Sequence, residues 1–596
     1  MNTSSSQTCQ NCKNQFVIEP DDFAFYGRIK VPPPTFCPEC RMQRRLVWRN
    51  EKTFFKRKCG APGHEEEIIT IYSEDAPFTV FDHGFWYSDQ WDPLSYGQEY
   101  DFSRPFFEQF GELLKKVPHV ALFDSKSVNS RYVNVTVEHK NCYLVTAGWN
   151  NEDSLYSNRI SYCKDTADSY ICHKTEFSYE NVYCKNSNRL FYSLNSEGCS
   201  NSYFLYDCVN CSDCVGCANL RNKQYYIFNQ PYSKEEYLKK LEELDLKSVS
   251  GIAQISEKFG ELYLRSLHRY AQLINTTNVT GDNIERSRNC YYCFDLAGEA
   301  ENVKYSHWGT YGLREAYDTG PGTGGNSELL YEGISIGVKN ARCKFGVIVW
   351  YSHDVEYGFN CQDSNDLFGC VGLRGKQYCI LNKQYSKEEY EKLIPKIVEH
   401  MNASPYTDKK GNTYRYGEFF PSELSPWSYN ETVAQDYLPL SEQDALKNGF
   451  AWHDAKARNY SITKQASALP ERITDVSDEI LKDVIGCAHE GACNQQCTAA
   501  FKIIPQELEF YRRMNLPLPR LCPNCRHGER LKKRNPLKLW HRTCACAGGG
   551  SESNIYKNTT AHFHGETRCP NEFETSYAPE RPEIVYCESC YQNEVV

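Results

Sequence analysis

The sequence predicts a multidomain, mainly β protein in which N- and C-terminal zinc ribbons flank a duplicated β-solenoid-like repeat region with capping helices. Paired cysteines recur at both ends of the 596-residue chain, the two ends align with each other, and the middle contains two copies of one unit. At roughly 100–200 residues per domain, a chain of this length contains several domains. The alternative for the middle is two related antiparallel β-sandwiches.

The N-terminal end carries two short cysteine pairs. Two residues separate Cys9 from Cys12 and Cys37 from Cys40, and 24 residues lie between the pairs. A Cys-x2-Cys turn points two sulfurs at one ion, so two such turns supply the four thiolates of a tetrahedral Zn²⁺ site. We therefore predict a zinc ribbon here.

The C-terminal end repeats this segment at a shift of 485 residues. Residues 37–41 and 522–526 both follow the pattern Cys-Pro-x-Cys-Arg, and Cys497 aligns with Cys12. Cys493 is the predicted first ligand, in a Cys-x3-Cys turn, and Cys487 is a spare candidate. The predicted ligands of the second zinc ion are Cys493, Cys497, Cys522 and Cys525.

The shared pattern is Cys-x2-Cys-x3-Phe, then Phe-Tyr, then Cys-Pro-x-Cys-Arg, over about 45 residues at each end. It resembles the family described as a probable zinc-ribbon domain. The whole chain is also similar to uncharacterised proteins of uncultured candidate-phyla bacteria that carry a ribbon at each end. This resemblance implies the architecture and implies no activity.

A third zinc site is predicted beyond the C-terminal ribbon. The alignment resumes at a shift of 505, so the C-terminal copy carries 20 extra residues between Cys544 and Cys569. The chain then ends in a further Cys-x2-Cys turn, which with two more ligands completes a tetrahedral set. The candidate ligands are Cys544 or Cys546, Cys569, Cys587 and Cys590, with His562 and His564 as alternatives. About three Zn²⁺ per chain, and no iron, are expected.

The N-terminal copy of this third site is predicted to be degenerate. Phe85 stands where the C-terminal copy has Cys590, and phenylalanine cannot bind a metal. We expect Cys59 and His64 to be remnants, with packing of large rings in place of an ion. A weak site formed by Cys59, His64, Asp82 and His83 is the alternative.

The middle of the chain consists of two copies, residues 129–245 and 289–398, related by a shift of 153 over most of their length. Short runs of Tyr, Phe, Val and Cys alternate with Asn, Asp and Gly turns, and turn residues such as Asn302 and Asn365 recur at multiples of roughly 12 residues. Regular short strands of this kind favour a β-solenoid, in which each coil buries a shared core against the next.

Each copy ends in a predicted helix that would cover an open solenoid end. The helices begin with the capping boxes Ser233-x2-Glu236 and Ser386-x2-Glu389. Further helices are predicted over 254–274 and near 105–115 from their apolar periodicity. The predicted domains are 1–60 N-terminal ribbon, 61–100 degenerate second ribbon half, 101–128 helix and connector, 129–250 first repeat, 251–288 helical connector, 289–402 second repeat, 403–480 extended connector, 481–543 C-terminal ribbon and 544–596 second C-terminal ribbon.

A run of four cysteines, Cys208, Cys211, Cys214 and Cys217, lies inside the first repeat. An iron–sulfur run of the ferredoxin kind has three residues before its last cysteine and a proline after it. Here two residues precede Cys217 and Ala218 follows it. We expect buried thiols in strands and turns, with a structural metal or a cluster as alternatives.

Two basic clusters interrupt an acidic chain whose net charge is −10. Residues 28–58 hold ten Lys/Arg and two Glu, and residues 512–542 hold ten Lys/Arg and one Glu, which leaves −27 for the rest. Clustered arginines bind the phosphates of nucleic acid, or they pair with acidic groups at a domain or protein interface. The candidate contact residues are Arg41, Arg44, Arg45, Arg49, Arg526, Arg530, Lys532, Lys533 and Arg534.

The predicted function is that of a non-catalytic, zinc-binding scaffold or binding protein whose basic ribbon ends contact a protein or nucleic-acid partner. The sequence shows no catalytic motif, and fully thiolate-bound zinc has no open position for chemistry. The alternative is a β-solenoid enzyme or carbohydrate-binding protein with purely structural zinc. Without an apolar run of about 18 residues or a secretory signal, a cytoplasmic location is expected.

Overall fold

The computed structural model describes residues 4–454 and 460–596, which form two compact units. Unit 1 comprises Met1–Phe123, Ala271–Asp454 and Leu537–Leu539. Unit 2 comprises Asp124–Tyr270, Ala455–Pro536 and Trp540–Val596. The N-terminal cysteine region therefore shares a unit with the second repeat, and the C-terminal region shares a unit with the first repeat.

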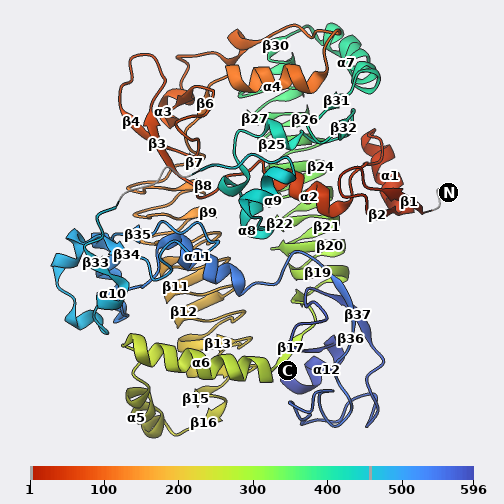
Figure 1. Ribbon diagram of the computed structural model, residues 1–596. Coiled ribbons are helices and arrows are strands. Elements are labelled where there is room, and N and C mark those ends of the chain that lie inside the picture. Colours follow the sequence, from red (N-terminus) through yellow and green to blue (C-terminus); the bar gives the residue numbers. More distant parts are fainter. Residues whose placement is uncertain (1–3, 455–459) are drawn as a thin grey trace. The chain divides into compact units, whose positions relative to one another are not determined.

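Long parallel sheets dominate both units, and helices pack around them (Figure 1). In unit 2, Ser200 pairs with Ser212 and Ser212 with Gln224, so partners are 12 residues apart along the chain. The alternative of antiparallel sandwiches is wrong, because successive repeat strands pair in parallel. The only antiparallel pairs in the two long sheets are their last strands.

The repeat of unit 2 contains a three-stranded and a seven-stranded sheet. Its strands are β7 (Asp124–Ser125), β8 (Asn134–Val137), β9 (Thr146–Trp149), β10 (Lys164–Ala167), β11 (His173–Tyr179), β12 (Lys185–Phe191), β13 (Ser200–Tyr206), β14 (Ser212–Ala218), β15 (Gln224–Ile227) and β16 (Gln230–Pro231). The remaining elements of this unit are α5 (Lys234–Leu244), α6 (Val249–Arg265), β17 (Leu267–Arg269), β33 (Lys464–Gln465), β34 (Ile485–Gly486), β35 (Ala500–Phe501), α10 (Pro505–Met514), α11 (Pro523–Lys532), β36 (Trp540–Thr543), β37 (Glu572–Thr575), β38 (Ile584–Tyr586) and α12 (Glu588–Val595), with short 3-10 turns at Ala466–Ala468, Ile473–Asp475 and Asp478–Lys482.

The repeat of unit 1 forms a thirteen-stranded sheet. Its strands are β18 (Leu273–Ile274), β19 (Thr277–Glu285), β20 (Arg288–Leu296), β21 (Ala300–Lys304), β22 (His307–Gly309), β23 (Leu313–Thr319), β24 (Ser327–Ile336), β25 (Lys344–Trp350), β26 (His353–Glu356), β27 (Phe359–Gln362), β28 (Asn365–Phe368), β29 (Gln377–Ile380) and β30 (Lys383–Gln384). The other elements are β1 (Ser5–Thr8), β2 (Gln15–Ile18), α1 (Pro20–Ile29), α2 (Pro38–Leu46), β3 (Phe55–Lys58), β4 (Glu67–Thr70), β5 (Val80–Phe81), α3 (His83–Trp86), α4 (Phe106–Lys116), β6 (His119–Val120), α7 (Lys387–Ala403), β31 (Tyr406–Thr407), β32 (Thr413–Tyr414), α8 (Val433–Tyr437) and α9 (Glu442–Lys447), with 3-10 turns at Pro93–Tyr96, Ser422–Leu424 and Tyr429–Glu431.

A three-residue period underlies the 12-residue interval of unit 2. From Lys126 to Tyr225, every third residue has a positive φ, which Asn, Asp and Gly tolerate best. The buried core uses another phase of the same period: Cys142, Val145, Ile160 and their successors lie two residues before such a turn. Each 12-residue interval therefore contains four turns and four inward positions.

The two predicted capping boxes are confirmed. Ser233 accepts a hydrogen bond from the Glu236 N–H at the start of α5, and Ser386 accepts from the Glu389 N–H at the start of α7. The helices contact β15 and β29, which are the last parallel strands of their sheets. The helix expected near 105–115 is confirmed as α4.

The helix predicted over 254–274 ends earlier. α6 stops at Arg265, and Leu267 instead lies fully buried in β17, where it pairs with Ile584 of β38. Its apolar periodicity continued into a strand because Leu267 and Tyr270 are also inward-facing in the extended chain. In Figure 1, α6 lies beside β13 and β14.

The predicted connector 403–480 has little regular structure beyond α8, α9 and short turns in its described part; residues 455–459 lie outside the described residues. Within 4–454 and 460–596, the structure contains no helix with the combination of length and apolar character that a bilayer crossing demands.

Candidate zinc centres and their arginine contacts

Four cysteine sulfurs converge in the N-terminal ribbon: those of Cys9, Cys12, Cys37 and Cys40, all within 4.8 Å of one another. Cys9 follows strand β1, and Cys37 is the N-cap of α2, with Pro38 at the first helical position. The Cys12 and Cys37 sulfurs lie 3.7 Å apart. Sulfurs on one tetrahedral zinc ion, with Zn–S bonds of about 2.3 Å, are about 3.8 Å apart.

The C-terminal ribbon forms an equivalent cluster of Cys487, Cys497, Cys522 and Cys525. Cys487 follows β34 as Cys9 follows β1, and its sulfur accepts a 3.3 Å hydrogen bond from the Cys522 N–H, as the Cys9 sulfur does from the Cys37 N–H. The structure thus places Cys487 at the position predicted for Cys493. Cys493 lies beside the cluster, with its sulfur 3.5 Å from that of Cys525.

A longer hairpin loop explains the different spacing. Gln7 pairs with Phe16, nine residues on, whereas Ile485 pairs with Phe501, sixteen residues on, so the C-terminal loop is seven residues longer. Cys487 is therefore ten positions before Cys497 in the chain and still adjacent to it in space. A hairpin signal, an apolar residue before and after the loop, was present in the sequence at Ile485 and Phe501.

The third cluster consists of Cys544, Cys569, Cys587 and Cys590, all of them buried. The Cys569 sulfur lies 3.8 Å from that of Cys587 and 3.6 Å from that of Cys590. Of the two candidates, the structure selects Cys544, whose sulfur accepts a 3.2 Å hydrogen bond from the Cys587 N–H. The neighbouring Cys544 thiol lowers the pKa of Cys587 to about 4, so this sulfur is a thiolate at neutral pH.

One local geometry builds all three clusters. In each, the first cysteine of the second pair is the N-cap of a helix (α2, α11 or α12) and donates its backbone N–H to another cysteine sulfur. The positive end of the helix dipole favours the thiolate form that zinc binds. The three four-cysteine clusters account for three Zn²⁺ ions, and four thiolates around each ion leave no position for a substrate.

A fourth, N-terminal copy of this geometry lacks two cysteines. The Asp82 N–H donates to the Cys59 sulfur over 3.3 Å, and Asp82 is the N-cap of the short helix α3. His64 Nδ1 lies 3.0 Å from an Asp82 carboxylate oxygen and 3.9 Å from the Cys59 sulfur. Phe85 packs edge-on against the His64 ring, as the predicted ring packing requires. His83 instead packs against Tyr87.

The arginines that follow the N-terminal knuckle are buried against carboxylates of unit 1. Arg41 and Arg45 lie 2.9 Å and 3.0 Å from the two carboxylate oxygens of Asp318, which is fully buried. Arg44 reaches Glu332 and Glu418, each at 2.7 Å. Burial raises the pKa of Glu332, and the surrounding arginines oppose that rise.

The C-terminal arginines repeat the arrangement within unit 2. Arg526 and Arg530 bind the two carboxylate oxygens of Asp168 at 2.5 Å and 2.7 Å, and Asp168 is fully buried. Arg526 also lies 3.2 Å from Glu507, whose pKa is raised by burial. The charges of these ribbons are therefore neutralised inside each unit.

The match extends to an aromatic ring. Arg526 lies over the Tyr156 ring at 4.4 Å, and Arg41 lies over the Tyr305 ring at 5.3 Å. Arg530 donates to the Tyr156 carbonyl over 3.0 Å. The equivalent donation in unit 1, from Arg45 to the Tyr305 carbonyl, spans 3.5 Å. The acidic partners were missed at the sequence level because Asp168 and Asp318 fall in the stretch where the repeat alignment changes its shift.

The remaining members of the candidate contact set differ in exposure. Arg49 is buried and pairs with Glu51 at 2.6 Å. Lys532 is exposed and pairs with Glu529 on its own helix, and Lys533 lies 3.8 Å from Glu180. Arg534 is half-buried. Of the rings proposed to stack on bases, Trp48 is fully buried and packs against Phe420.

The cysteine run of the first repeat lies in the hydrophobic core. Cys208, Cys211, Cys214 and Cys217 are at most 1% exposed, and they occupy consecutive inward positions of the three-residue period. The Cys208 thiol donates to the Tyr206 carbonyl over 3.4 Å, and Cys217 donates likewise to Val215. The spacing that resembled a cluster motif is therefore the period of the backbone itself.

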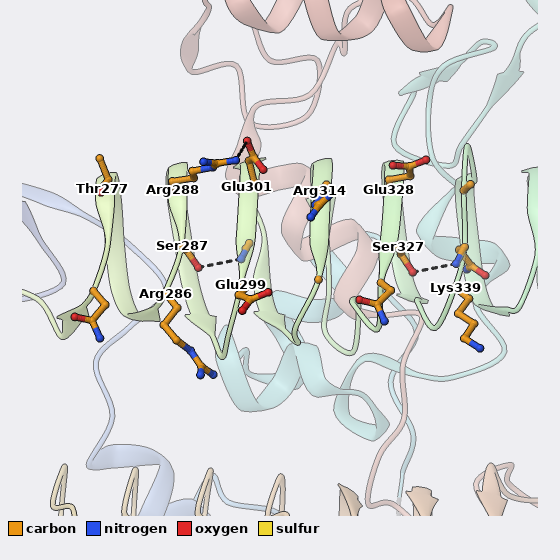
Figure 2. Close-up of a pocket in the computed structure, with 16 residues that line it drawn as sticks. Thr277, Arg286, Ser287, Arg288, Glu299, Glu301, Arg314, Ser327, Glu328 and Lys339 are labelled. Atoms are coloured by element: carbon orange, nitrogen blue, oxygen red, sulfur yellow. Dashed lines mark hydrogen bonds and ion pairs between the residues drawn. The ribbon is translucent and has the colours of Figure 1, made fainter.

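A polar groove of about 760 Å³ runs along the strands of unit 1. Figure 2 shows Arg288, Glu301, Arg314 and Glu328 in one row on successive strands, with Arg286, Glu299 and Lys339 in a second row. Backbone pairing places each acidic residue of the first row beside an arginine. Arg288 lies 2.7 Å from Glu301, and this hydrogen bond lowers the pKa of Glu301.

No protein-family model matches the chain, and comparisons with curated proteins and with solved structures yielded no match either.

Proposed function

We propose that this protein is a non-catalytic scaffold in which zinc-bound ribbons clamp two β-solenoid repeats and thereby hold a partner-binding surface rigid. The observation that carries the proposal is the pair of buried aspartates, Asp168 and Asp318, each held by two ribbon arginines. Zinc fixes the helix that bears those arginines, and the arginines fix the helix to the repeat. The ribbons are of the probable zinc-ribbon kind that the sequence pattern resembles.

The solenoid form of the repeats is supported by their pairing. Residues 12 apart pair in parallel over many successive intervals, and each interval contributes inward side chains to one core. Four turns per interval correspond to a four-sided coil. Stacked coils cannot bury their cores alone, so their ends and faces need covers. The helices α5 and α7 serve as end covers, and the ribbons serve as side clamps.

The partner we propose is a protein and not a nucleic acid. Phosphate binding requires accessible arginine and lysine side chains. Arg41, Arg44 and Arg45 are at most 3% exposed, as are Arg526 and Arg530 in the other unit. The polar groove of unit 1, with rows of both charges, is the proposed contact surface, because alternating charges complement a polar polypeptide better than a uniformly anionic strand.

Nucleic-acid binding by the full-length protein tests this choice. Fluorescence anisotropy with single-stranded RNA and with double-stranded DNA should show no binding that weakens steeply between 50 and 200 mM salt. The matched variant Lys532→Ala, which removes an exposed charge, should behave like the parent. Tight, salt-sensitive binding that is reduced by this variant would overturn the proposed clamp-only role of the ribbons.

The second candidate is a carbohydrate-binding or hydrolytic solenoid, which the groove favours by its size and polarity. Glycoside hydrolysis needs a carboxylic acid whose pKa is raised. Glu301 has its pKa lowered by Arg288 and so does not suit that role. Binding of a soluble polysaccharide that is lost on Arg314→Ala would favour this candidate over the protein scaffold.

A further inference from the structure

Beside the third zinc cluster lies a second group of metal-binding atoms. Cys546, His562 and His564 lie within 4.8 Å of one another and of Cys590, which also belongs to the four-cysteine cluster. All three come from the 20-residue segment that the C-terminal copy has and the N-terminal copy lacks. We propose that these residues bind a fourth metal ion, Zn²⁺, and that the Cys590 thiolate bridges it to the ion of the third cluster.

The interatomic distances suit one tetrahedral ion. Cys546 Sγ lies 3.6 Å from His562 Nδ1, and Cys590 Sγ lies 3.3 Å from His564 Nε2. With Zn–S bonds of about 2.3 Å and Zn–N bonds of about 2.0 Å, a sulfur and a nitrogen on the same ion are about 3.5 Å apart. Cys590 Sγ is at the same time 3.6 Å from Cys569 Sγ, so it lies within reach of both ions.

Both histidines are already oriented for metal binding. His562 Nε2 lies 2.9 Å from the Glu594 carboxylate, and both of these side chains are fully buried. His564 Nδ1 lies 2.7 Å from the Thr567 carbonyl oxygen. In each ring the second nitrogen therefore holds the proton, and the nitrogen that faces a sulfur has a free lone pair. Zinc-bound histidines characteristically use a carboxylate or carbonyl in this way.

Glu594 is itself fixed by four hydrogen bonds from Thr559 and Thr560. The backbone N–H groups and the hydroxyls of these residues donate to its oxygens over 2.9 to 3.1 Å. A buried carboxylate this fully satisfied keeps its charge and holds the His562 ring in one orientation. The segment thus supplies two ligands, their supporting acceptor and the donors that hold that acceptor.

Charge favours a second ion in this pocket. Five thiolates around one Zn²⁺ carry a formal charge of −3, and a second Zn²⁺ reduces it to −1. A buried charge of −3 is strongly disfavoured without counter-charges. Two neutral histidines complete the second ion without adding charge, and the sulfur and nitrogen donors select zinc over harder cations.

Native mass spectrometry of the full-length protein tests the proposal. The parent chain is expected to hold four zinc ions, and Cys546→Ser and His562→Ala are each expected to hold three. His541→Ala, which alters an exposed histidine of the same region, should retain four. A parent chain with three ions, or a Cys546→Ser variant that keeps four, would overturn the fourth site; either result leaves the three-ion clamp intact.

Cadmium-113 NMR on the parent protein keeps the test valid should Cys546→Ser fail to fold. A shared thiolate transmits spin coupling between the two cadmium nuclei, so two of four resonances should split each other. Three resonances without mutual splitting would contradict both the fourth ion and the bridge. Four resonances without splitting would contradict the bridging role of Cys590.

Discussion

Arg530 Nη1 lies 2.7 Å from Asp168 Oδ1, and neither side chain is more than 2% exposed. The aligned arginine of the other ribbon, Arg45, has the same relationship to Asp318 in the other unit, at 3.0 Å. The ribbon and its contact with the repeat were therefore duplicated together. Two independent copies of one buried ion pair make the contact a feature of the architecture and not of one local sequence.

Removing one arginine should destabilise only its own unit. Arg530→Ala leaves the buried Asp168 with less compensation, and breaking a buried pair in this way costs about 3–5 kcal/mol. Denaturant unfolding followed by hydrogen exchange should show the loss in unit 2 and not in unit 1. Lys532→Ala, on the same helix but exposed, should change the free energy of unfolding by less than about 0.5 kcal/mol. Equal effects of the two substitutions would contradict the clamp.

The position of Cys487 yields a prediction about zinc content. Cys487→Ser should lower the content by one ion, because the Cys487 sulfur belongs to the four-cysteine group. Cys493→Ser, a neighbour of the same chemistry, should keep the full number. Inductively coupled plasma mass spectrometry of the two purified variants measures the difference. Loss of zinc from the Cys493 variant alone would restore the ligand set that the spacing suggested.

The ribbons were predictable from spacing, and the N-terminal one was predicted residue by residue. The Cys493 assignment failed for a physical reason: a hairpin loop can grow without moving its ends, so the nearest cysteine in sequence is not the nearest in space. The same limit applies to Asp168 and Asp318, which acquire their role only when the repeat folds under the ribbon. Nothing local to an aspartate announces that two arginines more than 200 residues away will bind it.

The run at Cys208 shows the converse. Its spacing was visible in the sequence, but its cause, a turn at every third residue, became apparent only from the backbone. The parallel pairing at 12 residues was likewise foreshadowed by the recurrence of asparagines, whereas the exact end of α6 was not, because helix and strand periodicities both bury Leu267.

Repeat cysteines should resist alkylation while the protein is folded. Burial raises the pKa of Cys163, Cys343 and Cys361 to about 12 each, so the reactive thiolate is scarce at pH 8. After zinc removal, peptides that contain the cluster cysteines should be labelled by iodoacetamide well before those of the repeats. Peptide mass spectrometry over a time course measures the order, and simultaneous labelling would contradict the buried-core assignment.

Two buried histidines predict a loss of stability in mild acid. Burial lowers the pKa of His119 in unit 1 and of His268 in unit 2 to about 4. The unfolded chain, with a histidine pKa of about 6.5, binds the proton first, so stability is complete above pH 6.5 and falls as the pH decreases toward 4. At pH 5 each histidine accounts for a loss of about 2 kcal/mol.

The variant His268→Gln isolates this effect from acid release of zinc. Its unfolding free energy should fall less than that of the parent between pH 7 and pH 5, by about 2 kcal/mol. His541→Gln is the control, because Glu574 and Glu572 raise the pKa of this exposed histidine and so reverse the direction of its contribution. Identical pH profiles for the parent and His268→Gln would show that His268 is not buried as a neutral ring.

Hydrogen exchange before and after zinc removal tests the central claim most directly. The account predicts that chelation exposes α2 and α11 first, and that the strands holding their acidic partners, β23 and β10, then lose protection, while β13 and β14 keep it. Unchanged exchange in β23 and β10 after complete loss of zinc would contradict the claim that zinc holds the arginine helices on the repeats.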